Sequence, residues 1–189
     1  MSLTKENVAK NYQKFCSTGE KYGFLTADLK EFLGVDILTA PASTMTSLHN
    51  AFEGGLIAHI LTVTKYAVKI NDTLPDTLKV NLESLIKVCC LHQIGKAKLY
   101  VPNQSEWHVK NQGKVYEFNE ELISMRVGER SAYYALSNGI SLTDSEYQAI
   151  TSFDKDEDDK MAKWHSTMLA TILKQANELA IKEEKLNEQ

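Results

Sequence analysis

Two histidines lie inside long apolar segments, and the helical spacing around them constrains the fold more than any other feature. From about residue 55 to 70, apolar side chains recur every three or four positions around His59, and a second such segment, 76–94, contains His92. This spacing predicts helices with one buried face. A buried histidine needs a hydrogen-bond partner or a metal ion. The sequence therefore predicts a helical core with polar groups near its centre.

The rest of the chain predicts a mostly helical, all-α fold class with one small β-hairpin. Thr4, Thr26 and Thr143 each stand where a side chain caps the start of a helix, and Thr143 begins a capping box. Alternating apolar residues around a turn at 111–113 predict the hairpin within 106–118. The other helices are predicted over about 4–15, 26–32, 120–137, 144 onward and 159–185.

Composition narrows the classes of protein to consider. The 189 residues fit one domain, and a formal charge of -4 argues against a nucleic-acid binder that depends on a net basic field. No apolar run approaches the roughly 20 residues that span a bilayer, and the N-terminus lacks the apolar stretch of a signal peptide. Three cysteines without metal-site spacing suit a reducing compartment. We therefore expect a cytoplasmic protein that does not bind membranes.

Five short segments, in the same order along the chain, resemble motifs of the HD (His-Asp) metal-dependent phosphohydrolase superfamily. Residues 49–59 resemble the pattern His-His-Ala-Tyr-Pro-Gly-Gly-Leu-Leu-x-His, found in the branch that includes HD domains of bacterial 3′-5′ exoribonucleases. Residues 91–96 resemble Leu-His-Asp-Ile-Gly-Lys, and residues 126–131 resemble Gly-His-Gly-Glu-Lys-Ser. Two later segments, 146–153 and 176–180, resemble the remaining motifs, the last of them Ala-Asp-x-Leu-Ala.

This resemblance covers about residues 45–181. It implies an HD-domain-like helical bundle that forms a single domain over residues 1–189. Residues 1–44 would then be an N-terminal helical extension that packs on the bundle.

The resemblance also implies a metal site, which this chain matches only in part. Active members hold one or two divalent metals with histidines and aspartates and hydrolyse phosphoesters. His59 and His92 match the first two ligands, whereas Gln93 and Asn177 stand where the family has aspartates. Histidines of the family are also replaced, by Val127 and Phe153. We therefore expect catalysis to be absent or severely weakened.

The surviving ligands limit which cofactor to expect. A neutral amide lacks the anionic oxygen that a hard divalent cation prefers. We expect no cofactor; if a metal binds, it is a divalent ion (Zn, Mn, Mg or Fe) held by His59 and His92. Imidazole suits zinc, and His49 is the nearby candidate for a third ligand. The alternative is that both histidines are hydrogen-bonded core residues, with Gln93 and Asn177 among their partners.

Basic residues near the motifs offer a second kind of site. Arg126 and Arg130 are the two arginines among 21 basic residues, and their i, i+4 spacing puts them on one face of a helix. Together with Lys96 they could bind the phosphate of a nucleotide. The alternative is structural, because Lys96 and Arg130 take basic positions that are usual in the family.

The favoured interpretation is a phosphohydrolase-like protein with a decayed metal site that binds a nucleotide, another phosphate-containing small molecule, a protein partner or a second copy of itself. Nucleic acid stays open as a ligand. The candidate binding residues are His49, His59, His92, Gln93, Lys96, Arg126, Glu129, Arg130 and Asn177.

Two alternatives remain open. One is an active phosphomonoesterase or phosphodiesterase, acting on nucleotides or nucleic acid, in which Glu129 or Asp154 supplies a carboxylate. The other is a purely structural or interaction domain with a filled pocket, in which Gln93 and Asn177 satisfy each other as a buried amide pair.

Overall fold

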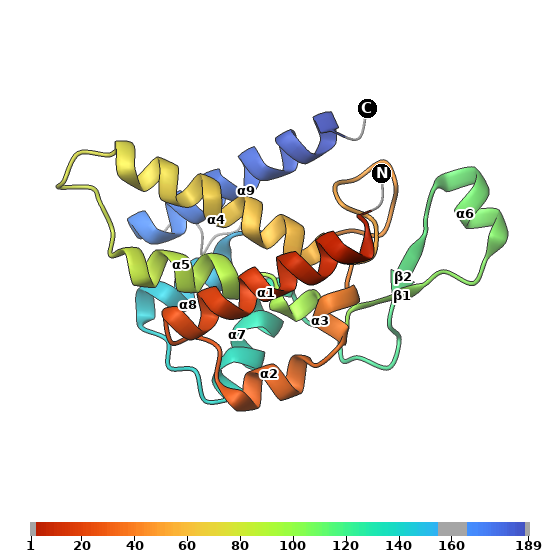
Figure 1. Cartoon of the computed structure of the whole chain (residues 1–189), viewed down its shortest axis with the longest axis horizontal. Coiled ribbons are helices and arrows are strands. Elements are labelled where there is room, and N and C mark those ends of the chain that lie inside the picture. The colour runs from red at the N-terminus through yellow and green to blue at the C-terminus, as the bar shows by residue number, and fades with distance from the viewer. Residues whose placement is uncertain (1–2, 155–165, 188–189) are drawn as a thin grey trace.

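The computed structural model describes residues 3–154 and 166–187, and helices dominate this part of the chain (Figure 1). It contains nine α-helices, one short 3-10 helix and one two-stranded antiparallel sheet, which confirms the predicted fold class. The elements are α1 (Lys5–Lys21), α2 (Ala27–Leu33), α3 (Asp36–Thr39), α4 (Gly55–Thr73), α5 (Leu82–Leu91), η1 (Ile94–Lys96), β1 (Tyr100–Pro102), α6 (Glu106–Gln112), β2 (Tyr116–Phe118), α7 (Val127–Ser137), α8 (Asp144–Ser152) and α9 (Met168–Asn187).

The capping residues predicted from the sequence begin three of these helices. The side chains of Thr4 and Thr26 accept hydrogen bonds from the backbone N–H groups of the third residue beyond each. The capping box is also present, since Thr143 accepts from the N–H of Glu146 at 3.3 Å and the Thr143 N–H donates to the Glu146 carboxylate at 2.9 Å. The same carboxylate accepts from Lys87 Nζ at 2.9 Å, which ties α8 to α5. Glu146 is therefore buried with a full set of partners.

Several predicted helix bounds are wrong. α1 continues to Lys21, and the helix predicted to start near residue 76 begins at Leu82, where Asn81 caps it by accepting from the Ser84 N–H at 3.0 Å. The helix predicted from residue 120 begins at Val127. Within the described residues the last helix begins at Met168, and the predicted start at 159 lies outside them.

The predicted hairpin exists, but with other strands. β1 and β2 pair antiparallel with Tyr100 opposite Phe118, and α6 fills most of the connection between them. Residues 106–112, predicted as part of a strand and turn, are helical because the Ser105 side chain caps the first turn by accepting from the His108 N–H. Gly113 ends this helix at a φ of 63°, a left-handed conformation that glycine adopts freely.

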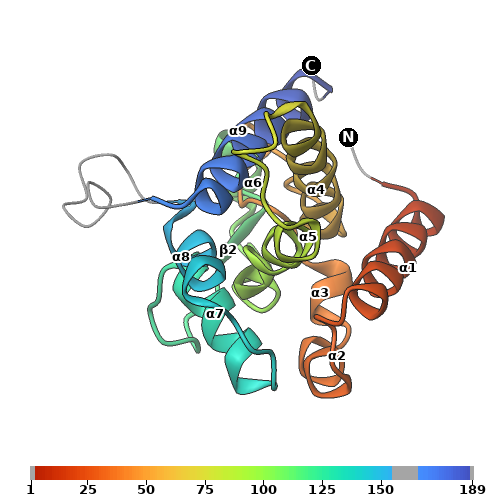
Figure 2. The same cartoon turned by 90° about the vertical axis from the view of Figure 1, so that its left-hand side faces the viewer.

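α4 and α9 make the most extensive helix–helix contact of the described residues, and they lie side by side along one edge of the molecule in both views (Figures 1 and 2). α5 packs on α4, and α8 packs on α9 and α7. The N-terminal helix α1 packs on α4 and α5. Leu56, Ile60 and Val63 of α4 are completely buried, and they share this helix with His59. The apolar face therefore carries an imidazole into the core.

A close approach at Gly95 fixes the turn that follows His92. The Gly95 N–H donates to the Ser131 hydroxyl at 2.9 Å, and a Cβ atom on Gly95 would lie 2.8 Å from the Val127 carbonyl oxygen. Since a side chain has no room there, η1 sits directly against α7. This contact holds the His92–Gln93 segment in place beside α4.

Candidate functional site

His59 is the hub of a buried polar cluster between α4 and α9. Its side chain is 0% exposed, and both of its ring nitrogens have partners on α9. Asn177 and Glu184 are seven residues apart, which is close to two helical turns, so they project from the same face of α9. One imidazole therefore contacts two polar side chains of the neighbouring helix.

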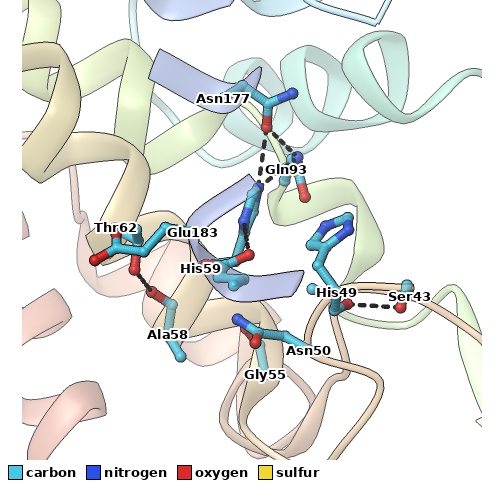
Figure 3. A network of polar contacts seen from close by, with 12 residues as sticks. Ser43, His49, Asn50, Gly55, Ala58, His59, Thr62, Gln93, Asn177 and Glu183 are labelled. Atoms are coloured by element: carbon cyan, nitrogen blue, oxygen red, sulfur yellow. Dashed lines mark hydrogen bonds and ion pairs between the residues drawn. The ribbon is translucent and has the colours of Figure 1, made fainter. Parts of the chain in front are cut away.

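The Nε2 side of His59 faces two amides. His59 Nε2 lies 3.0 Å from Asn177 Oδ1 and 3.2 Å from Gln93 Nε2, and Gln93 Nε2 donates to Asn177 Oδ1 at 3.2 Å (Figure 3). Gln93 and Asn177 thus form the buried amide pair that was one of the two alternatives from the sequence. We call His59 Nε2, Gln93 and Asn177 the amide side of the cluster.

The Nδ1 side of His59 faces a carboxyl group that the sequence motifs do not include. Glu184 Oε2 lies 2.8 Å from His59 Nδ1, and Glu184 is only 7% exposed. Burial raises the pKa of Glu184 to about 8, against the opposing effect of hydrogen bonds from Thr62 and Asn50. Burial likewise lowers the pKa of His59 to about 3. The imidazole is therefore neutral at neutral pH, and the protonated Glu184 donates to its Nδ1.

A backbone carbonyl holds the ring of His92 in place. Its Nδ1 donates to the Cys89 carbonyl oxygen at 2.7 Å, and burial lowers its pKa to about 3, so the ring is neutral with the proton on Nδ1. A backbone carbonyl commonly fixes the tautomer of metal-binding histidines in this way. Among the described residues Nε2 has no hydrogen-bond partner, although it is buried. The ring centroid lies 6.2 Å from that of His59.

Phe153 lies against His92, where the family has a histidine. The Phe153 ring meets the His92 ring edge-on at 4.8 Å between centroids and is buried. Val127, the other apolar replacement, is partly buried and packs on the core. Apolar groups therefore stand at the two positions where the resemblance to the HD superfamily implies histidines.

His49 approaches His59 from the loop before α4 (Figure 3). The two ring centroids are 4.7 Å apart, and the Ser43 hydroxyl anchors the backbone here by donating to the His49 carbonyl oxygen at 2.6 Å. Burial lowers the pKa of His49 to about 2, and nearby positive charges act in the same direction. Its Nε2 is buried without a hydrogen-bond partner in the described part of the chain.

His49, His59 and Glu184 together form a group that could hold a metal ion. One ligand atom from each lies within 4.8 Å of the other two. We call Glu184, His49 and the Nδ1 edge of His59 the carboxylate side of the cluster. The sequence suggested His49 as a third ligand but missed Glu184. Glu184 follows Asn177 by seven residues, about two helical turns, and this spacing could have indicated that both side chains lie on one helix face.

The family's own metal position has a different set of donors. His59, His92, Gln93 and Asn177 do converge, as the resemblance implies, but they supply two imidazoles and two amides and no carboxylate. The Asn177 oxygen also accepts hydrogen bonds from Gln93 and from His59 Nε2. This set does not fit Mg²⁺ or Mn²⁺, which prefer anionic oxygen ligands.

Two of the three basic residues predicted to bind phosphate donate to backbone carbonyls, and the third is exposed. Lys96 is largely buried, and its Nζ donates to the Ala42 carbonyl oxygen at 2.7 Å; burial lowers its pKa to about 8, while Asp154 and Glu184 oppose this shift. Arg130 is buried and donates through Nη2 to the Ile123 carbonyl oxygen. Arg126 precedes α7 with an extended backbone and is exposed, so it does not extend the helical face of Arg130.

Neither carboxylate proposed for an active enzyme is buried in the cluster. Glu129 lies on α7 and Asp154 follows α8, and both side chains are exposed.

A separate cavity of about 520 Å³ lies between α3 and the β1–β2 sheet. Glu53, Lys98, Tyr100 and Tyr116 are among the residues that line it. None of the candidate binding residues from the sequence does so, although Ala97 of its wall follows Lys96 directly.

No helix among the described residues is both long enough and apolar enough to cross a membrane.

No family model and no solved structure matches the chain. One curated protein does: the chain is 39% identical over 70 residues to the dihydroneopterin 2′,3′-cyclic phosphate phosphodiesterase of Methanocaldococcus jannaschii. The match covers 36% of this chain and 27% of that protein. The chain is thus a distant and partial relative of a cyclic phosphate phosphodiesterase.

Proposed function

We propose that this chain is a phosphohydrolase-like protein that binds a nucleotide or another phosphate-containing small molecule beside His59 and His92, with little or no hydrolysis. The observation that carries the proposal is the amide side of the cluster. Four residues at the family's ligand positions, His59, His92, Gln93 and Asn177, occupy one buried region, yet they contain no carboxylate. The similarity to a phosphodiesterase that acts on a cyclic phosphate supports a phosphate ligand.

Lys96 is the cation best placed to meet such a ligand. It follows the His92–Gln93 turn, and its charge lowers the pKa of both His59 and His92, which places it near their rings. With its own pKa at about 8, the amine is mostly protonated at neutral pH. A phosphate in contact with Nζ would replace the hydrogen bond to Ala42.

Binding is tested by thermal denaturation with a panel that includes inorganic phosphate, nucleoside monophosphates and 2′,3′-cyclic nucleotides, in the presence of a chelator. At least one ligand should raise Tm, because a ligand that binds only the native state stabilises it. Lys96→Met should abolish the shift, and Lys110→Met, which removes an exposed lysine on α6, should leave it unchanged. No shift with any ligand contradicts the proposal. So does a shift that survives Lys96→Met and disappears in Tyr116→Ala, because the ligand would then lie in the separate cavity.

Loss of hydrolysis is tested by restoring the family's carboxylates. The wild-type chain with Mn²⁺ should leave a 2′,3′-cyclic nucleotide uncleaved, and the double variant Gln93→Asp/Asn177→Asp should gain manganese-dependent cleavage. Asn177 is nearly isosteric with aspartate, and Gln93 is one methylene longer. The double variant therefore changes the volume of the cluster only slightly.

A second candidate function is an active metal-dependent phosphodiesterase. The His49–His59–Glu184 group favours it, since it retains one carboxylate next to two imidazoles. Robust manganese- or zinc-dependent turnover by the wild-type chain, lost in Glu184→Gln, would support this candidate and contradict the first.

A further inference from the structure

We infer that His49, His59 and Glu184 form a zinc site on the carboxylate side of the cluster, which shares only His59 with the family's metal position. The three residues come from the loop before α4, from α4 and from α9. Their ligand atoms lie within 4.8 Å of one another, and His59 Nδ1 and Glu184 Oε2 are already 2.8 Å apart. Gln93, Asn177 and His92, which mark the family's position, take no part in this group.

The donor set indicates which ion fits. Two imidazoles and one carboxylate are the protein ligands of several zinc sites, where water or a substrate takes a fourth, open position. Imidazole nitrogen suits zinc, whereas Mg²⁺ and Ca²⁺ prefer oxygen ligands throughout. The single carboxylate also supplies the negative charge that is missing from the amide side. Zinc is therefore the ion that these three residues match best.

Burial supports a cation here independently of the donor types. Among the described residues Glu184 lies 2.8 Å from His59 Nδ1 and forms no ion pair with a lysine or arginine. His49 Nε2 is a buried ring nitrogen without a hydrogen-bond partner in the same part of the chain. Buried polar groups are normally satisfied, and buried charges are paired or bind metals. A divalent ion would satisfy both groups at once.

Binding requires a modest rearrangement. Ligands about 2.0–2.1 Å from a tetrahedral zinc lie roughly 3.3 Å from one another, so the group must contract from its present spread. His49 can supply this movement because it lies in a loop, while His59 and Glu184 lie on packed helices. The proton held between His59 Nδ1 and Glu184 leaves for solvent as the metal binds, because both ligands must be deprotonated.

Such a site would join three parts of the chain. Through His49 and His59 the ion would link the loop before α4 to α4. Through Glu184 it would link α9 to the same helix. Its open fourth position would face a water molecule or a phosphate oxygen. Zinc binding should therefore stabilise the fold, and this stabilisation is measurable without any assay of activity.

The experiment uses the full chain, stripped with a chelator and dialysed, and titrates zinc alone in competition with a chromophoric chelator. Elemental analysis gives the stoichiometry. We expect about one zinc ion per chain and a rise in Tm on addition of zinc. Since loss of an outer-sphere partner alone weakens metal binding by about 10–100-fold, His49→Ala and Glu184→Gln should each weaken it by at least about 100-fold. His49 is only partly buried and Gln is isosteric with Glu, so both variants should fold.

Three control variants locate the ion. His92→Ala should retain zinc binding within a few-fold, because His92 is not a ligand of the proposed site. Asn177→Ala removes the hydrogen-bond partner of His59 Nε2, so it should weaken binding by no more than about 10–100-fold, the effect of an outer-sphere change. His108→Ala removes a histidine on α6 that takes no part in the cluster, and it should have no effect. Circular dichroism confirms that each variant is folded before the titration.

Two outcomes overturn the inference. One is the absence of zinc binding by the wild-type chain. The other is zinc that is lost in His92→Ala or Asn177→Ala but kept in His49→Ala and Glu184→Gln, which would place the ion at the family's position. Neither outcome affects the proposed phosphate binding, because that test is made in the presence of a chelator.

Discussion

Two buried glutamates in this fold, Glu146 and Glu184, have opposite surroundings. Glu146 accepts from Lys87 Nζ and from the Thr143 N–H, and both are donors that suit an ionised carboxylate. Burial raises its pKa, but these hydrogen bonds outweigh burial, and the net pKa lies below the ordinary value of 4.5. Glu184 meets a neutral imidazole instead, and burial raises its pKa to about 8.

Glu146 is therefore a structural carboxylate, whereas the carboxyl group of Glu184 is available to bind a proton or a metal ion. The hydrogen bonds around Glu146 stabilise its ionised carboxylate, so no further cation or proton is required to compensate its charge. Glu184 is buried at a cost to its ionised form, and either a proton or a metal cation can compensate that cost. A buried acid whose partners do not match its charge is thus a better pointer to a functional site than burial alone.

The largest expected effect comes from removing the hub of the Glu184 cluster. His59→Ala should lower the free energy of unfolding by about 3 kcal/mol, because it leaves a cavity and removes a hydrogen-bond partner from both Asn177 and Glu184. Urea denaturation of metal-free protein measures this change. The control is His108→Ala, which should change the stability by less than about 0.5 kcal/mol. Equal small effects in both variants would show that the cluster contributes little to stability.

The next effect concerns the structural glutamate. Glu146→Gln should destabilise the fold by about 1–2 kcal/mol at neutral pH, since Lys87 loses its anionic partner while the cap is retained. Because the folded pKa of Glu146 is lowered, its contribution is present above about pH 4.5 and is lost as the pH falls through the folded pKa. Wild type and variant should therefore converge in acid. A difference that stays constant with pH would contradict this account, and Glu129→Gln, an exposed change on α7, is the control.

The smallest effect should have the opposite sign. With zinc removed by a chelator, Glu184→Gln should raise the free energy of unfolding by about 1 kcal/mol at neutral pH. The reason is that the folded chain must keep a proton on Glu184 that the unfolded chain, with a pKa near 4.5, has already released. The adjacent change Glu183→Gln removes a surface pair with Lys65 and should destabilise slightly. A clear loss of stability in Glu184→Gln would mean that the two glutamates do not differ as described.

Local signals predicted the helical framework well and the short elements poorly. Threonine caps such as Thr4 and Thr26 act on their own helix, so the sequence suffices to find them. The strands at 100–102 and 116–118 are three residues each, too short for alternation to show. Trp107 and Val109 imitated that alternation, although the cap at Ser105 makes their segment a helix.

The candidate site was predictable where a motif named its residues. The motifs named His59, Gln93 and Asn177, whose polar side chains contact one another, and His92, whose ring lies 6.2 Å from that of His59. Glu184 was not predictable in this way, because it lies beyond the last motif in a segment rich in charged residues, a composition typical of solvent-exposed helix ends. Its burial depends on α9 packing against α4, which is a tertiary effect.

The spacing of the His59 contacts along the chain has a consequence for how the protein matures. Two of its partners come 118 and 125 residues later, so these contacts close one of the longest loops in the chain. Such pairings form slowly, since the entropy of loop closure opposes them. Until α9 packs against α4, the apolar side chains of α4 and the imidazole of His59 are exposed to solvent. During synthesis on the ribosome, this apolar face of α4 would stay exposed until α9 has been made. A chaperone that binds the nascent chain would bind this face.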